Sequence, residues 1–267
     1  MRYLGNDRSF SMKLAVVTGA AQGIGRRAAE ILAGAGYSLA LLDLQSCAST
    51  LVGVRATGCE AEDFPGDLSD ESVVEAAAEA IRTRWNRVDV LVNNAGISSI
   101  APAETIDART FRRVLEVNLV APFLLARAFG KLMLQQRSGC IVNVASIAGL
   151  AGIGDRAAYN ASKHGLIGLT RTLAAEWGGR GVRCNAVCPG WVKTEMDVAD
   201  QAGGNYTDQD IIDVNPMGRF ASPDDIAKAI LFLADPNQSG FVNGHALVVD
   251  GGWTTDASWQ TLRLAHR

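Results

Sequence analysis

The sequence lacks blocks of basic residues, long apolar runs and an apolar leader. No five or six lysines or arginines stand together in its 267 residues, and the formal net charge is −3. Nothing therefore indicates binding to phosphate backbones or anionic lipid. No apolar run is long enough to span a bilayer, and residues 1–11 have no apolar core of a signal peptide. We expect a cytoplasmic protein without nucleic-acid or membrane partners, with Met12 as an alternative start to Met1.

Cysteine and histidine are also scarce. The five cysteines are odd in number and scattered, which favours reduced thiols over a disulfide framework. Cys184 and Cys188 bracket a strand-like run, but with only three histidines elsewhere we expect no metal site. A composition of 48% hydrophobic and 20% charged residues suits a globular chain that buries a large core. One large α/β domain is the resulting expectation.

Short apolar runs alternate with helical patterns along the chain. Strands are predicted at residues 13–17, 38–42, 61–64, 88–92, 140–144, 182–187 and 246–249. Helices are predicted at residues 26–35, 70–85, 107–117, 121–136, 157–177 and 223–233. Because the strands are continuously apolar, they indicate a parallel sheet covered on both faces. We expect a leader at residues 1–11, a domain at 12–253 with an irregular segment at 191–220, and a tail at 254–267.

The turn after the first strand contains Gly19, Gly23 and Gly25. A glycine-rich turn between a buried strand and a helix start exposes backbone amides and the positive end of the helix, which can hold a pyrophosphate. The spacing is G-x-x-x-G-x-G and not the commoner G-x-G-x-x-G, so the generic fingerprint is not matched literally. A glycine-rich turn selected only for its geometry is the alternative.

Asp43 ends the second strand, 18 residues past Gly25. A carboxylate there can accept hydrogen bonds from the adenosine ribose and would repel a 2′-phosphate, which favours NAD over NADP. Arg26 and Arg27 could soften that preference, and a solvated strand-end carboxylate is the alternative. Residues 67–68, after the third strand, are placed to bound an adenine ring, although Asp67 could instead cap the next helix.

Tyr159 and Lys163 lie four residues apart in a predicted helix and therefore on one face of it. A neighbouring ammonium favours the phenolate, so we expect Lys163 to lower the Tyr159 pKa and make it a usable proton shuttle. The Y-x-x-x-K pattern alone is common by chance. A tyrosine at the edge of the core beside a solvated lysine would produce it as well.

Taken together, the motifs resemble those of the classical short-chain dehydrogenase/reductase family. The matching residues run in order along nearly the whole chain: Thr18, Gly19, Gly23, Gly25, Asp67, Asn93, Asn94, Ala95, Gly96, Asn118, Ser146, Tyr159, Lys163, Pro189, Gly190 and Thr194. The resemblance implies a single-domain α/β Rossmann fold, with a seven-stranded, mostly parallel, doubly wound sheet and helices on both faces. It also implies assembly as a homotetramer, or possibly a homodimer, through the long middle helices.

The resemblance further implies a role for each matching residue. Ser146 would hydrogen-bond the substrate oxygen, Tyr159 would transfer the proton, and Lys163 would bind the nicotinamide ribose. Asn118 would complete a water-linked proton path. The expected cofactor-binding residues are Gly19, Gln22, Gly23, Ile24, Gly25, Asp43, Asp67, Leu68, Asn94, Ala95, Gly96, Tyr159, Lys163, Pro189, Gly190, Val192 and Thr194.

The substrate is expected to be selected by residues 191–220, which could close over the ligand as a lid. This segment has six acidic residues against Lys193 and Arg219, which disfavours an anionic substrate unless the carboxylates are merely solvated. An apolar wall could be formed by Trp191, Met196, Tyr206 and Met217, and the small apolar residues 147–154 would leave room above the nicotinamide.

These features predict an NAD-dependent dehydrogenase that interconverts a secondary alcohol, such as a polyol or sugar, and its ketone. A 3-oxoacyl-(acyl-carrier-protein) reductase is the alternative, since such enzymes look very similar across these motifs. It would favour NADPH and need a basic patch, which could consist of Arg109, Arg112, Arg113 and Arg127. A non-catalytic dinucleotide-binding sensor is a more remote alternative, disfavoured by the complete set of Ser146, Tyr159 and Lys163.

Overall fold

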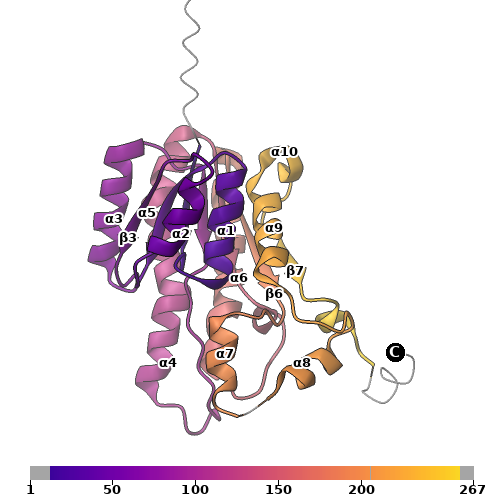
Figure 1. Ribbon diagram of the computed structural model, residues 1–267. Helices are drawn as coiled ribbons and strands as arrows, with labels where there is room; N and C mark the ends of the chain where they lie inside the picture. The colour runs from indigo at the N-terminus through magenta and orange to yellow at the C-terminus, as the bar shows by residue number, and fades with distance from the viewer. Residues whose placement is uncertain (1–12, 205, 259–267) are drawn as a thin grey trace, which may run out of the picture.

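The computed structural model describes residues 13–204 and 206–258 and shows seven parallel strands in one sheet (Figure 1). The strand order is β3-β2-β1-β4-β5-β6-β7, and every neighbouring pair is parallel. The strands are β1 (Leu14–Thr18), β2 (Ser38–Asp43), β3 (Ala61–Pro65), β4 (Val90–Asn93), β5 (Gly139–Val144), β6 (Val182–Pro189) and β7 (Ala246–Val249). The predicted parallel sheet and Rossmann architecture are therefore confirmed.

Helices cover both faces of the sheet, and the alternation of side chains along each strand divides the core between them. Ala15 and Val17 of β1 face one layer, formed by α1 (Gly23–Gly34), α2 (Ala48–Arg55) and α9 (Pro223–Ala234). Leu14 and Val16 face the other layer, formed by α3 (Glu71–Trp85), α5 (Ala121–Gln136) and α6 (Ala157–Trp177). All four β1 side chains are fully buried. The near-continuous apolar strands reflect this two-sided burial.

The middle helices form one continuous helix, whereas the sequence predicted two separate helices at residues 107–117 and 121–136. The α4 helix (Ala108–Leu115) passes through a π-helical turn, η1 (Glu116–Val120), directly into α5. The resulting helix, Ala108–Gln136, has the length and apolar composition to cross a membrane, which inspection of apolar runs did not reveal. Half of its most apolar window is buried inside the protein. That burial is the behaviour of a core helix.

The lid segment is helical and not irregular. It contains α7 (Glu195–Gln201) and α8 (Asp208–Val214), whose first turns are capped by the hydroxyls of Thr194 and Thr207. Both helices lie with α4 beyond the same end of the sheet (Figure 1). The short helices α2 and α10 (Pro236–Ser239) were also not predicted. The leader, and Trp259 and Leu262 of the tail, lie outside the described residues.

Gly25 and Gly34 make a matched test of how closely α1 approaches the first turn. A Cβ on Gly25 would lie 2.0 Å from the Gly19 carbonyl oxygen, whereas one on Gly34 would meet nothing within 4 Å. We expect Gly25→Ala to destabilise the protein by about 1–3 kcal/mol or more, because backbone must move. Gly34→Ala should be neutral or stabilising by about 0.4–1 kcal/mol. Thermal unfolding of the two variants measures the difference, and an unchanged Tm for Gly25→Ala would contradict it.

Candidate active site

The ends of β1, β4, β5 and β6 open onto a cleft of about 390 Å³. Most of the site residues expected from the sequence line this cleft: Gly19, Gln22, Gly23, Ile24, Asp43, Asp67, Leu68, Asn94, Ala95, Gly96, Ser146, Tyr159, Lys163, Pro189, Gly190, Val192 and Thr194. Gly25 and Asn118 do not line it and are buried next to it. Residues from seven segments of the chain thus line one cleft at the carboxyl ends of the strands.

The glycine-rich turn leaves room for a ligand at the start of α1. Gly19 and Gly23 adopt positive φ values of 64° and 54°, which disfavour any side chain. Gln22 precedes the helix without capping it through its side chain, so the first backbone N–H groups of α1 remain able to bind an anion. A dinucleotide pyrophosphate fits this turn, since the backbone can approach the ligand closely.

Thr18 and Asn94 fasten this turn to β4. The Thr18 hydroxyl oxygen accepts hydrogen bonds from the backbone N–H groups of Asn94 and Ala95, both at 3.0 Å, and donates to the Val92 carbonyl at 3.3 Å. In return the Asn94 side-chain amide donates to the carbonyls of Thr18 and Gly19. Thr18 belongs to the sequence motif, but its bridging role depends on a residue 76 positions away and was not foreseen.

Asp43 stands at the end of β2 in the cleft wall. Its carboxylate accepts hydrogen bonds from the backbone N–H groups of Ala21 at 3.0 Å and Gln45 at 2.9 Å. These bonds fix the carboxylate beside the glycine-rich turn. An acceptor is therefore held where a ribose hydroxyl could donate to it.

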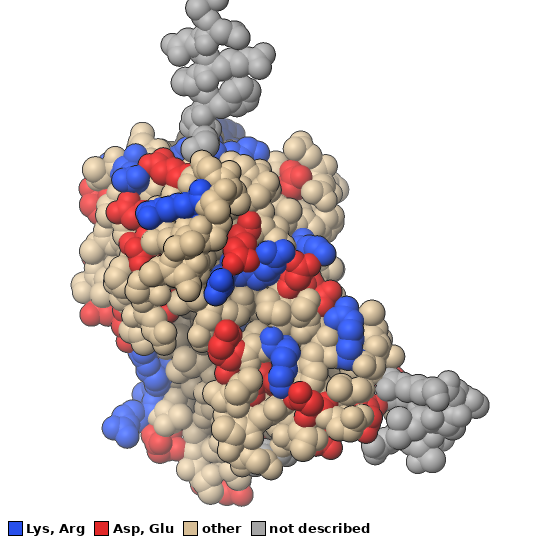
Figure 2. Space-filling view, in the orientation of Figure 1, with Lys and Arg blue, Asp and Glu red and all other residues tan. Residues whose placement is uncertain are grey.

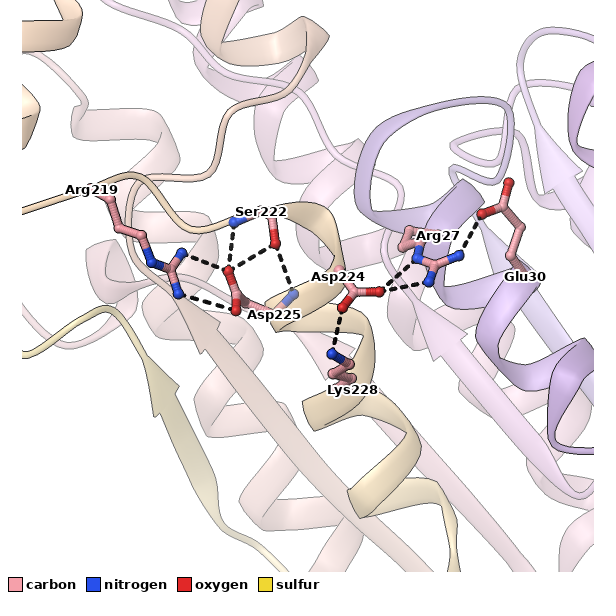
Figure 3. Close-up of polar contacts among 7 residues, drawn as sticks. All are labelled: Arg27, Glu30, Arg219, Ser222, Asp224, Asp225 and Lys228. Carbon is pink, nitrogen blue, oxygen red and sulfur yellow. Dashed lines mark hydrogen bonds and ion pairs between the residues drawn. The ribbon is translucent and has the colours of Figure 1, made fainter. Parts of the chain in front are cut away.

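The arginines that could have offset Asp43 are engaged elsewhere. Arg27 pairs with Asp224 of α9 at 2.7 Å and with Glu30 at 3.0 Å (Figure 3). Arg26 pairs with Glu30 at 3.1 Å. Neither arginine is among the described residues that line the cleft. The negative charge of Asp43 is thus not offset by these two side chains.

The same part of α9 also anchors the end of the lid. Arg219 pairs with Asp225, whose carboxylate accepts hydrogen bonds from the backbone N–H and the hydroxyl of Ser222 (Figure 3). The bond from Arg219 is the main cause that lowers the Asp225 pKa. The lid is therefore attached through an ion pair to the helix that packs on α1.

Asp67 lies in the cleft wall at the end of β3. Burial alone would raise its pKa, but hydrogen bonds from Ser69 and the Arg113 guanidinium lower it overall. Asp70, and not Asp67, caps α3. The alternative reading of Asp67 as a helix cap is wrong, and the residue remains available to bound a ligand.

Ser146, Tyr159 and Lys163 meet where β5 and α6 face the cleft. Ser146 follows β5, and its hydroxyl oxygen accepts a hydrogen bond from the Ala148 backbone N–H at 3.1 Å. The Lys163 ammonium donates to the Val144 carbonyl at 2.8 Å and lies 5.5 Å from the centre of the Tyr159 ring. The end of β5 thus positions the serine and binds the lysine ammonium, while α6 carries both the tyrosine and the lysine.

The charges of Lys163 and Tyr159 are governed by burial. Lys163 is only 4% exposed, and burial lowers its pKa to about 8. Burial also raises the Tyr159 pKa, although a hydrogen bond with Ser146 and the charge of Arg156 oppose this. The expectation that Lys163 lowers the Tyr159 pKa is therefore wrong for the protein by itself. The Lys163 ammonium donates to the Val144 carbonyl, and the Tyr159 pKa is shifted by burial, Ser146, Arg156 and Asp200.

Asn118 lies in the π-helical turn and is fully buried. Its side chain accepts a hydrogen bond from the Ile97 N–H and donates one to the Ile97 carbonyl, each at 2.9 Å, and another to the Ser162 hydroxyl at 3.1 Å. A Cβ on Gly96 would lie 3.2 Å from the Asn118 amide oxygen and 3.7 Å from the Lys163 nitrogen. Asn118 therefore braces the strand-end segment that passes over Lys163.

The opposite end of the cleft is polar and was not foreseen. Arg156, the residue just before α6, donates to the Ser98 hydroxyl at 2.7 Å and to the Asp200 carboxylate of the lid at 2.9 Å. Its guanidinium lies 5.6 Å from the centre of the Trp191 ring. The Tyr206 hydroxyl donates to Asp197 at 3.1 Å.

Three members of the expected apolar wall, Trp191, Met196 and Tyr206, line the cleft. Met217 does not, and it is 63% exposed. The Trp191 and Tyr206 rings are 5.2 Å apart. The wall is therefore aromatic on one side and crossed by ion pairs on the other.

The face of the molecule drawn in Figure 2 carries no large area of one charge. Figure 2 shows acidic and basic side chains interspersed over this face. Of the arginines considered as a basic patch, Arg113 pairs with Asp67 and Arg127 with Glu71. Those two charges are partly neutralised within the protein.

In comparisons with known proteins, the chain is similar to oxidoreductases over most of its length. A family model described as enoyl-(acyl carrier protein) reductase matches residues 19–254. D-Threitol dehydrogenase of Mycolicibacterium smegmatis is 40% identical over 244 residues, covering 91% of this chain and 93% of the relative. Galactitol 2-dehydrogenase (L-tagatose-forming) of Cereibacter sphaeroides is 40% identical over 245 residues, covering 90% and 94%. A 3-oxoacyl-(acyl-carrier-protein) reductase of Synechocystis is 34% identical over 247 residues, covering 91% and 98%.

Solved structures agree with the sequence matches. Levodione reductase superposes with a TM-score of 0.88 at 35% identity, covering 91% of this chain and 98% of that chain. A protein described as a gluconate 5-dehydrogenase from Beutenbergia cavernae, with NADP bound at low occupancy, gives a TM-score of 0.86 at 42% identity. It covers 91% of this chain and 97% of that chain.

Proposed function

The chain belongs to the classical short-chain dehydrogenase/reductase family, and on this basis we propose that it oxidises a neutral secondary alcohol with NAD, with Tyr159 as the proton-transferring group. The family membership and an activity on alcohols and ketones follow from the comparisons. The cofactor preference, the tyrosine mechanism and the substrate class are the proposal. The observation that carries it is the meeting of Ser146, Tyr159 and Lys163 in one cleft.

The proposed chemistry divides the work between the cofactor and three side chains. A nicotinamide dinucleotide, when bound, accepts the hydride from the carbinol carbon. Tyr159, as its phenolate, takes the hydroxyl proton as the carbon–oxygen bond becomes a carbonyl, and Ser146 donates a hydrogen bond to that oxygen. Lys163, fixed by the Val144 carbonyl, has further N–H groups to offer the nicotinamide ribose. In the reverse direction the Tyr159 phenol returns the proton.

Two observations support NAD over NADP. Asp43 holds a carboxylate in the cleft wall where the adenosine ribose is expected, and a 2′-phosphate beside it would meet charge repulsion. Arg27, the nearby cation that could have bound such a phosphate, is paired with Asp224 and Glu30. NADP is bound in the Beutenbergia structure, so the preference of this chain needs its own measurement.

Two of the relatives support a polyol or sugar alcohol as substrate, whereas the Beutenbergia structure is named for gluconate, a sugar acid. The names of the threitol and galactitol dehydrogenases both specify neutral alditols. Assembly as a homotetramer, with a homodimer as the alternative, and a cytoplasmic location remain parts of the proposal.

Reduction of a 3-oxoacyl thioester is the second candidate. The Synechocystis relative and the description of the family model favour it. The pairing of Arg113 with Asp67 and of Arg127 with Glu71 weakens the basic patch that an acidic carrier protein would need. A non-catalytic sensor would bind the cofactor without turnover. Alcohol oxidation that is lost when the Tyr159 hydroxyl is removed would argue against such a sensor.

Tyr159→Phe tests the proton-transfer role. We expect kcat for alcohol oxidation with NAD to fall by about 10²–10⁴-fold, because general acid–base catalysis is removed, while NADH still binds. Since burial raises the Tyr159 pKa, wild-type oxidation should quicken as the pH rises and ketone reduction should not. Tyr37→Phe removes a hydroxyl outside the cleft and is the control. Equal activity of wild type and Tyr159→Phe on alditols would contradict the mechanism.

Asp43→Asn tests the cofactor preference. We expect the KM for NAD to rise by about 10-fold or more, because a hydrogen bond to a charged group contributes about 1.5–3 kcal/mol, and the KM for NADP to fall or stay constant. Asp63→Asn is the control, since Asp63 binds the Ser46–Cys47 turn outside the cleft. A parallel rise for both cofactors would show that Asp43 serves the turn and does not select the ribose.

A further inference from the structure

We propose that the ion pair between Arg156 and Asp200 selects substrates by charge, admitting neutral polyhydroxy alcohols and excluding sugar acids with the same carbon skeleton. The proposal rests on the proposed function, because it names the substrate class of the same site. Both side chains line the cleft close to Tyr159. Neither was among the site residues expected from the sequence.

The pair is well placed to act on the substrate. Arg156 precedes the first turn of α6, three residues before Tyr159, and Asp200 lies in α7 of the lid. The two side chains are 9% and 17% exposed, and their atoms are 2.9 Å apart. Both charges act on the Tyr159 phenol, Arg156 lowering and Asp200 raising its pKa. The pair therefore lies beside the reacting end of the substrate.

The other cations of the cleft are already occupied. Among the described residues that line it, the remaining lysine and arginine are Lys163 and Arg113. Lys163 donates to the Val144 carbonyl and, in the proposed function, gives its remaining N–H groups to the nicotinamide ribose, while Arg113 pairs with Asp67 at the adenosine end. Lys193 of the lid is held by Asp197 and Asp208. An anionic substrate would thus depend on Arg156 for a counter-charge.

The Asp200 carboxylate already neutralises the charge of Arg156 that such a substrate would need. A substrate carboxylate at this guanidinium would lie beside the nearly buried Asp200 carboxylate, and two like charges that share one partly buried cation repel each other. A neutral polyol avoids this conflict, because its hydroxyls can donate to Asp200 and accept from Arg156 while the ion pair stays intact. Vicinal hydroxyls match the adjacent donor and acceptor. Because the Arg156–Asp200 pair has no net charge, this end of the cleft favours a neutral alditol over an aldonate.

The pair also connects the lid to the active-site helix, so loss of Asp200 could act through structure alone. The two effects differ in their readout. A loosened lid lowers kcat/KM for neutral and anionic substrates together, whereas an unmasked guanidinium changes their ratio. The test is consequently a ratio measured on matched substrates.

The experiment compares kcat/KM with NAD for two matched pairs, galactitol with galactonate and threitol with threonate, in wild type and Asp200→Asn. The wild type should prefer the alditols. Asp200→Asn should lower the alditol-to-aldonate ratio by about 10-fold or more, since a charge-assisted hydrogen bond to the aldonate becomes possible. Asp200→Glu should restore the wild-type preference.

Asp208→Asn is the matched control, because Asp208 is an exposed lid carboxylate that pairs with Lys193 and does not line the cleft. Its ratio should equal that of the wild type. Calorimetric titration of galactonate into each NADH-bound protein gives a readout that does not need turnover, and binding should appear or tighten only in Asp200→Asn.

Three outcomes contradict the account in distinguishable ways. Equal loss of activity on alditol and aldonate in Asp200→Asn, without a gain in galactonate binding, would show a structural role and overturn the inference alone. A wild-type preference for the aldonates would overturn it as well. Absence of alcohol oxidation by the wild type with either NAD or NADP would overturn the proposed function and the inference together.

Discussion

The hydrogen bonds that join the ends of β1 and β4 are the constraint on which the cleft depends. The strand order reverses between these two strands, and a parallel sheet forms a crevice at such a switch point. Thr18 and Asn94 close the gap between the two strand ends by exchanging backbone and side-chain hydrogen bonds. Gly19 is thereby pulled against the Asn94 side chain, and a Cβ there would lie 2.7 Å from its amide nitrogen. Gly19 and Gly25 follow from this close approach, since a Cβ on Gly25 would also lie 2.5 Å from the Asn94 amide nitrogen.

The reactive end of the cleft depends on a second constraint, the burial of a lysine. An ammonium that is 4% exposed needs a partner, and the Val144 carbonyl at the end of β5 supplies it. That bond fixes the Lys163 ammonium next to Gly96, and Asn118 holds the neighbouring Ile97 by two hydrogen bonds. The buried Lys163 ammonium therefore links the end of β5, the helix α6 and the segment held by the π-helical turn η1. Arg156 and Asp200 complete the wall from the lid side.

The sequence was sufficient to predict the features that depend on local pattern. Apolar runs located the central strands, because burial on both faces removes any alternation, whereas β3 contains Glu62 and Asp63 and is only partly buried. The glycine-rich turn and the pair of Tyr159 and Lys163 were recognisable by spacing. Features that depend on distant partners were missed. The separation of 44 positions between Arg156 and Asp200 hides their pairing. The π-helical register that buries Asn118 has no signal in the hydrophobic period. The α2 helix was missed because its glycine and β-branched residues are weak helix formers. The effect of Lys163 on Tyr159 was misjudged because the sequence does not give the burial of either group.

The central claim is that this cleft moves a hydride from a carbinol carbon to a nicotinamide, and isotopic labelling tests it most directly. An alditol carrying deuterium on the carbon to be oxidised would be incubated with the wild-type protein and NAD, and the NADH analysed by mass spectrometry. The account predicts that the deuterium appears in the NADH in proportion to the ketone formed. Product whose deuterium has passed to water, with unlabelled NADH or none, would contradict it and point to proton-transfer chemistry such as isomerisation.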